Sequence, residues 1–301
     1  MNNPSFSPVI GINVENKPAC NGVPEFNYIS YDYIDAIVNA GGIPVLLPPV
    51  DKLELIPELL NKVDGVLFIG GPDLNPNNDH YKIHTSVRMM SERRENFDRA
   101  LMKEVASRRI PVMGIGVGMQ LLNVSQGGSL FYHIPEDLPR ALLHRDSNSD
   151  YTLRHRLIVE KGSLLASVYG DNDVRVNSRH HMAIDDVASG FVVTARCPGL
   201  ADMKASTDDE TRGGDPVIEA IESCMEDWFA FGVQFHPEAK QSATALDLKI
   251  FEKFVEGVVL SKETGRNMLV VKPHAKESSK KKPRKSKTAD STSVVFGNLK
   301  S

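Results

Sequence analysis

A histidine and a carboxylate stand two residues apart, directly after an apolar strand pattern. The stretch is FGVQFHPE, which places His236 and Glu238 just beyond Phe235. This spacing suits an imidazole base whose tautomer and positive charge are stabilised by a neighbouring carboxylate. An isolated His-Pro-Glu is more often an ordinary loop, so its meaning depends on a second feature elsewhere in the chain.

Alternating glycines form that second feature. In PVMGIGVGMQLLNVSQGG, an apolar run leads into Gly114, Gly116 and Gly118, and an amphipathic segment follows. Three interpretations are open. A nucleotide site would need a different glycine spacing, or a Lys-Ser/Thr pair that this stretch lacks. In the second interpretation, the glycines serve only to let a helix pack closely on a sheet. The third interpretation is a nucleophile elbow, a tight turn that pushes its central residue, here Gly116, into a cleft.

Alternating strand and helix patterns must position these residues. In the first half, apolar strands are predicted at 8–15, 43–49, 65–71 and 110–116, and helices at 28–42, 52–63, 91–109 and 118–126. Such strands, separated by helices, predict an α/β fold with a mostly parallel sheet that is covered on both faces. The second half adds strand patterns at 154–160, 173–178, 191–197, 216–223 and 228–235. A hairpin-type loop is expected over 206–216 and a closing helix over 242–262.

Charge divides the chain into two parts. The net charge is −4, but residues 262–301 carry 11 Lys and Arg against 3 Asp and Glu. We therefore predict one globular domain over 1–261 and a basic tail without stable structure over 262–301. The tail suits contact with nucleic acid or with another acidic surface, and a solvated tail without a partner is the alternative.

The cysteine count and the hydropathy exclude several classes of protein. Cys20, Cys197 and Cys224 are too few and too widely spaced for a disulfide framework or a zinc site. No run approaches the ~20 apolar residues of a membrane span, and the N-terminus lacks a secretory pattern. We expect a cytoplasmic protein that holds no metal and no cofactor.

Together with further stretches, these features resemble the class I glutamine amidotransferase-like proteins, and among them the gamma-glutamyl-gamma-aminobutyrate hydrolase type. The matching stretches span about residues 8–258 in the family's order: AGGIPVLLPP, DGVLFIGGPDLNP, PVMGIGVGMQLLNVSQGGSLFYHI, VNSRHHMAI, VIEAIES and FGVQFHPE. The resemblance implies a flavodoxin-like sheet flanked by helices, and hydrolysis of a small gamma-glutamyl amide by a Cys-His-Glu triad. A homodimer is left open.

The resemblance also implies roles for individual residues. The nucleophile position is Gly116, the base is His236 and the orienting acid is Glu238. The oxyanion-hole donors would be the N–H groups of Gly71 and Val117. Six further positions match substrate-binding or cleft-wall positions, although the two histidines among them also fit ordinary loop positions: Gly70, Gln120, Asn177, Ser178, His180 and His181.

Three departures from the family pattern fall in the implied cleft. Gly116 replaces the cysteine, Val117 replaces an arginine that is usual in the hydrolases, and Met182 replaces a glutamine. Covalent catalysis through residue 116 is therefore excluded.

Two hypotheses follow from these departures. The first is an amide hydrolase that uses water directed by His236 and Glu238, or a substitute nucleophile such as Cys20. The second is a binding or regulatory protein that keeps the pocket without turnover.

Overall fold

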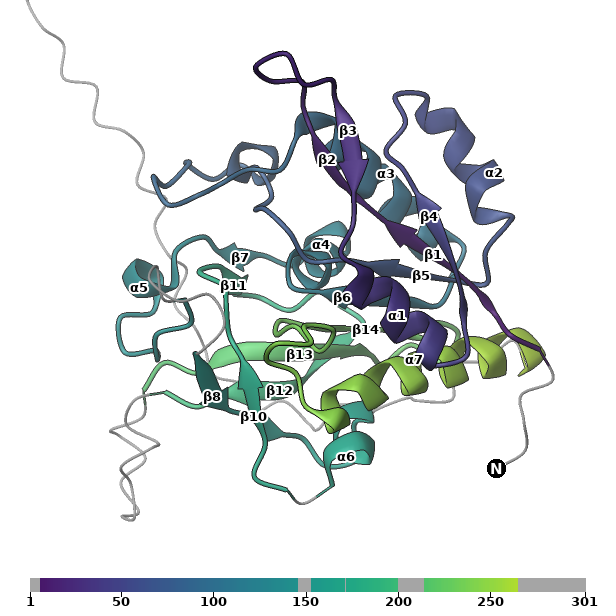
Figure 1. Cartoon of the computed structure of the whole chain (residues 1–301). Coiled ribbons are helices and arrows are strands. Elements are labelled where there is room, and N and C mark those ends of the chain that lie inside the picture. The colour runs from purple at the N-terminus through teal and green to yellow at the C-terminus, as the bar shows by residue number, and fades with distance from the viewer. Residues whose placement is uncertain (1–5, 146–152, 171, 200–213, 265–301) are drawn as a thin grey trace, which may run out of the picture.

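An eight-stranded sheet runs through the centre of the molecule (Figure 1). The computed structural model describes residues 6–145, 153–170, 172–199 and 214–264. The strands lie in this spatial order: β4 (Ile43–Leu47), β1 (Val9–Asn13), β5 (Gly65–Phe68), β6 (Val112–Ile115), β14 (Ala230–Val233), β13 (Val217–Ser223), β12 (Phe191–Cys197) and β9 (Ile158–Val159).

The sheet changes direction at β14. Strands β4, β1, β5, β6 and β14 pair in parallel, whereas β13, β12 and β9 extend the sheet with antiparallel pairs. The prediction of a mostly parallel sheet with additional strands from the second half is confirmed. The carboxyl ends of β5, β6 and β14 lie side by side, because these three strands are parallel neighbours. In such sheets that edge carries the ligand site.

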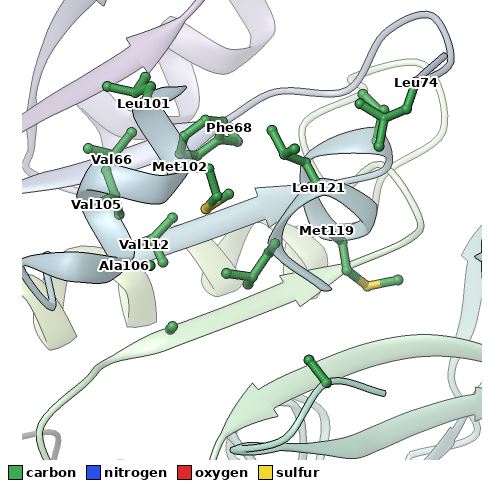
Figure 2. Packing of buried hydrophobic residues seen from close by; sticks show 14 of the residues in the cluster. Val66, Phe68, Leu74, Leu101, Met102, Val105, Ala106, Val112, Met119 and Leu121 are labelled. Carbon is green, nitrogen blue, oxygen red and sulfur yellow. The ribbon is translucent and has the colours of Figure 1, made fainter. Parts of the chain in front are cut away.

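Helices cover both faces of the sheet. Successive residues of β5 alternate between two apolar clusters: Val66 and Phe68 belong to one, and Leu67 to the other. This alternation places the clusters on opposite faces. The first cluster packs α2 (Ile56–Leu60), α3 (Glu92–Ser107) and α4 (Val117–Ser125), and Figure 2 shows part of it. The second packs α1 (Tyr31–Asn39), α6 (Leu164–Tyr169) and α7 (Ala245–Thr264).

Several short elements depart from the predicted pattern. The run 8–15 divides into β1 and β2 (Glu15–Lys17), which forms a hairpin with β3 (Phe26–Tyr28) outside the main sheet. The run 154–160 likewise divides into β8 (Arg154–Arg156) and β9. Strand β8 pairs with β10 (Arg175–Asn177) and not with the central sheet. Both runs divide because only part of each run pairs with the central sheet. Apolar periodicity alone does not indicate where that pairing stops.

Most of the remaining short elements were not predicted. Strands β7 (Leu130–Phe131) and β11 (Ala183–Ile184) form a two-stranded pair. The helical turns η2 (Pro76–Asp79) and α5 (Ile134–Asp137) also lie outside the predicted helices. The helix predicted over 52–63 forms as the turn η1 (Leu53–Leu55) followed by α2.

The closing helix continues past the predicted end of the globular domain. Helix α7 ends at Thr264, three residues beyond residue 261. Residues 265–301 of the basic tail and residues 206–213 of the expected hairpin loop lie outside the described residues. The division into a domain and a tail stays a prediction. Within the described ranges, no helix combines the length and the apolar character needed to cross a membrane.

Candidate active site

The alternating glycines form a strained, tightly packed turn between β6 and α4. Gly116 has φ 55° and ψ −115°, a conformation that side-chain-bearing residues rarely adopt. A Cβ atom on Gly114 would lie 2.6 Å from the carbonyl carbon of Gly118, and one on Gly118 would lie 2.4 Å from the carbonyl oxygen of Phe68. The outer glycines therefore permit close packing of the helix on the sheet, and the central one permits the turn.

The turn faces the imidazole of His236. A Cβ atom built on Gly116 would lie 3.5 Å from both Nε2 and Cε1 of that ring, which is an ordinary van der Waals contact. His236 reaches this place because it follows β14, the parallel neighbour of β6. A cysteine side chain at residue 116 would therefore fit beside Nε2 without displacing the ring.

Glu238 contacts His236 at its second ring nitrogen, Nδ1. Its Oε1 lies 2.7 Å from Nδ1 of His236, and the carboxylate is buried. Burial disfavours the charged carboxylate, but the charge of the imidazole and its hydrogen bond outweigh this effect and lower the pKa of Glu238. Burial, and then the neighbouring Glu238, raise the pKa of the Tyr33 hydroxyl. That hydroxyl accepts a hydrogen bond from the backbone N–H of Gly70 at 3.2 Å.

The carboxamide of Asn177 fixes the backbone of His236. Asn177 Oδ1 accepts from the His236 N–H at 2.8 Å, and Asn177 Nδ2 donates to the His236 carbonyl, also at 2.8 Å. The same Nδ2 donates to Ser242 Oγ at 3.0 Å. These bonds use both ends of the carboxamide, so Asn177 positions the imidazole and does not face the cavity.

The loop after β5 forms the opposite wall. Asn13 Oδ1 accepts from the backbone N–H of Ile69 at 2.8 Å, and the buried guanidinium of Arg94 donates to the carbonyl of Gly70 at 3.2 Å. These bonds hold the backbone that leads into Gly71. Across the cavity, Val117 is the first residue of α4, so its N–H group has no acceptor within the helix.

A cavity of about 250 Å³ lies between these walls. Seven of the eleven predicted catalytic, oxyanion-hole and substrate-binding residues line it: Gly71, Gly116, Val117, Gln120, His180, His181 and His236. The structure brings the rest near the cavity but not into its lining. Gly70 packs against the His236 ring, where a Cβ atom would lie 2.5 Å from Cε1. Ser178 is buried and donates to the carbonyl of His144 at 2.8 Å.

Sequence reasoning missed the cationic lining of the cavity. Three arginines, Arg88, Arg145 and Arg179, line it together with one acidic residue, Asp73. The arginines come from loops that the resemblance did not assign to substrate binding, and only Arg179 lies inside a matching stretch, NSRHH. Guanidinium groups are well suited to binding carboxylates. Gln234 was also missed, and its Oε1 accepts a hydrogen bond from Gln120 Nε2 at 3.0 Å.

The residues at which the sequence analysis expects departures from the family pattern lie at this cavity. Val117 and Met182 both line it. Cys20 lies in the exposed turn between β2 and β3, and within the described ranges no cysteine lines the cavity. Cys197 is buried and Cys224 is partly buried.

The fold and the cavity define a class of protein. A strained turn after a parallel strand faces a hydrogen-bonded His-Glu pair across a cationic cavity, an arrangement typical of amide-cleaving α/β proteins that use a triad. The chain belongs to the Peptidase C26 family, whose model matches residues 8–238. The recognition of the family from the sequence is confirmed.

Relatives support this assignment. The gamma-glutamyl-gamma-aminobutyrate hydrolase PuuD of Escherichia coli is 32% identical over 230 residues, which cover 74% of this chain and 83% of PuuD. A candidate glutamine amidotransferase of Mycobacterium tuberculosis is 33% identical over 253 residues, covering 83% of this chain and 74% of that protein. The solved structure of a candidate GMP synthase component from Thermoplasma acidophilum shares the fold, with a TM-score of 0.53 at 15% identity. It covers 86% of this chain and 97% of the other.

Proposed function

We propose that this protein is a gamma-glutamyl amide hydrolase-like protein that binds a small gamma-glutamyl compound in the cavity beside Gly116. It cleaves the amide slowly, through water directed by His236 and not through a thiol. The observation that carries this proposal is the 3.5 Å between the Cβ position of residue 116 and Nε2 of His236. The base is in place, whereas the position facing it has no side chain.

The shape and charge of the cavity suit the glutamyl group. Its volume of about 250 Å³ is close to the lower end of small-molecule sites, ~300–1,000 Å³. Arg88, Arg145 and Arg179 would bind the α-carboxylate of the glutamyl group. The relatives named gamma-glutamyl-gamma-aminobutyrate hydrolase support a substrate of this class.

The chemistry follows from the same geometry. A water molecule in the space of the missing thiol attacks the amide carbonyl carbon while Nε2 of His236 takes its proton. The N–H groups of Gly71 and Val117 stabilise the oxyanion, and His236 then gives the proton to the leaving amine. Loss of the nucleophile from a comparable triad costs about 10⁶-fold in kcat and leaves ~10³–10⁴-fold over uncatalysed water attack.

A second candidate function is binding without turnover. The glycine at residue 116, together with the apolar Val117 and Met182 in the cavity lining, favours it. In that case the cavity binds gamma-glutamyl compounds without cleaving them, and His236 only contributes to the binding surface.

Calorimetric titration with gamma-glutamyl-gamma-aminobutyrate, together with an assay of product release, tests the proposal. We expect binding, and slow hydrolysis that His236→Ala abolishes. Arg145→Gln should weaken binding by about 10–100-fold because it removes one charge-assisted hydrogen bond. The control Lys103→Gln, on the exposed side of α3, should leave the affinity unchanged. Binding without hydrolysis would favour the second candidate function, and failure to bind any gamma-glutamyl compound would overturn both.

A further inference from the structure

Three histidines and one glutamate converge in the interior next to the cavity wall. They are His144, His155 on β8, His180 and Glu219 on β13, with exposed fractions of 2%, 4%, 8% and 0%. Only His180 also lines the cavity beside Gly116. The mechanism proposed above uses none of these four side chains, so the cluster needs an explanation of its own.

The distances within the cluster match the edges of a metal coordination tetrahedron. Glu219 Oε1 lies 3.3 Å from His144 Nδ1, 3.3 Å from His155 Nε2 and 3.2 Å from His180 Nε2. His144 Nδ1 lies 3.0 Å from His180 Nε2. Zinc bonds of ~2.0–2.1 Å in tetrahedral geometry separate the ligand atoms by about 3.3 Å.

Two of the rings direct Nε2 toward the centre of the cluster while Nδ1 contacts a backbone carbonyl. Nδ1 of His155 lies 3.1 Å from the carbonyl of Arg156, and Nδ1 of His180 lies 2.9 Å from the carbonyl of Met182. A carbonyl oxygen only accepts, so both Nδ1 atoms carry a hydrogen, and in the neutral ring each Nε2 atom keeps a lone pair. Metal-binding histidines are typically oriented by such a bond to a backbone carbonyl.

Glu219 gives a second, independent indication of a missing cation. Neither of its carboxylate oxygens has a hydrogen-bond partner within the described residues, although the side chain is fully buried. Its close neighbours are the three ring nitrogens, which lie 3.2–3.3 Å from Oε1. A fully buried carboxylate that accepts no hydrogen bond is unfavourable, and a cation at the centre would satisfy it together with the nitrogen lone pairs.

We propose that His144, His155, His180 and Glu219 bind one divalent cation of the zinc class in a closed structural site. Three imidazoles and one carboxylate suit Zn²⁺, and four protein ligands leave no open position for a reactive water. The expectation of no metal rested on the cysteines. The ligands are histidines and a glutamate that lie far apart in the sequence, without a spacing motif.

The site would fix the cationic wall of the cavity. Two of its ligands, His144 and His180, are direct chain neighbours of Arg145 and Arg179, which line the cavity. The other two ligands are held on β8 and β13. A bound cation would therefore tie the loops that carry both arginines to the strands behind them.

A second cluster provides a matched control. His84, His133 and Glu136 also lie within ligand distance of one another, but they are partly or fully exposed. Both ring nitrogens of His84 have hydrogen-bond partners: Nδ1 lies 2.6 Å from Ser86 Oγ, and Nε2 lies 3.0 Å from Glu136 Oε1 within the cluster. This cluster needs no cation. A variant of it therefore measures the general effect of removing a histidine on stability and on zinc content.

Metal analysis of the full chain, purified without an affinity tag or a chelator from zinc-supplemented cells, tests the proposal. We expect about one zinc per chain by mass spectrometry. Stripping the metal should lower Tm, and Zn²⁺ at a hundredfold excess over its Kd should restore it by ~5–10 °C. Co²⁺ added to the stripped protein should give the visible absorption of a tetrahedral site.

Two variants locate the site. Glu219→Gln should lose the bound zinc and the Tm shift, whereas His84→Gln should keep both. A chain that holds no zinc and shows no Tm shift with Zn²⁺ would overturn the proposal and would indicate that the cluster is held by a shared proton. Equal zinc content in the two variants would also overturn it. If Glu219→Gln fails to fold, the stripped native chain and its Co²⁺ spectrum decide the question. These measurements do not depend on the proposed amide chemistry.

Discussion

Gly116→Cys should hydrolyse gamma-glutamyl amides at least about 10³-fold faster than the native chain. The new thiol would start from a Cβ atom 3.5 Å from Nε2 of His236, within reach of a hydrogen bond to the imidazole. That ring and the N-terminus of α4 both lower the pKa of a thiol, so a reactive thiolate would form. Release of glutamate under saturating substrate measures the gain.

The same substitution should destabilise the fold. A side chain at φ 55° costs ~1–3 kcal/mol, which would lower the free energy of unfolding. Gly116→Ala is the matched control, because it carries the same backbone strain without a thiol and should show no gain in activity. His236→Ala in the Gly116→Cys background should remove the gain. A cysteine variant no faster than the alanine variant would contradict the assigned nucleophile position.

Gly118→Ala should be the most destabilising single methyl addition in this region. The new Cβ atom would lie 2.4 Å from the carbonyl oxygen of Phe68 and 2.9 Å from its carbonyl carbon. Both are backbone atoms of Phe68, the last residue of β5, so α4 must move away from the sheet. We expect a loss of more than about 3 kcal/mol in the free energy of unfolding. Denaturant titration of the full chain measures it.

Ser125→Ala provides the comparison for this second prediction. Ser125 lies near the end of the same helix, and its hydroxyl donates to the carbonyl of Leu122 within that helix. Its replacement should change the free energy of unfolding by less than about 1 kcal/mol. If Gly118→Ala is equally mild, the close contact between α4 and the end of β5 is not required for stability.

Much of the fold is predictable because the relevant signals are local. The parallel strands are continuous apolar runs, and helix α3 begins where Ser91 accepts a hydrogen bond from the Arg94 N–H, as the N-cap pattern predicts. The β2–β3 hairpin and the β8–β10 pair were not predicted. Both consist of strands of three residues that lie outside the main sheet, where burial imposes no clear periodicity.

The candidate site was predictable only where its residues share a motif. His236 and Glu238 are two residues apart, and the structure places them within 2.7 Å of each other. Arg88 and Arg145 carry no such signal, since loops bring them to the cavity from separate parts of the chain. Asn177 was found by resemblance, but its bonds to the His236 backbone appear only in three dimensions.

Intact-mass measurement after incubation with an electrophilic glutamine analogue is the most direct test of the central claim. That claim is that the cavity keeps a base facing residue 116 but holds no nucleophile. We predict that Gly116→Cys gains one adduct at residue 116, which a gamma-glutamyl amide suppresses, and that the native chain gains none in the cavity. An adduct on a cavity residue of the native chain, suppressed by the same amide, would show that another side chain serves as the nucleophile and would contradict the claim.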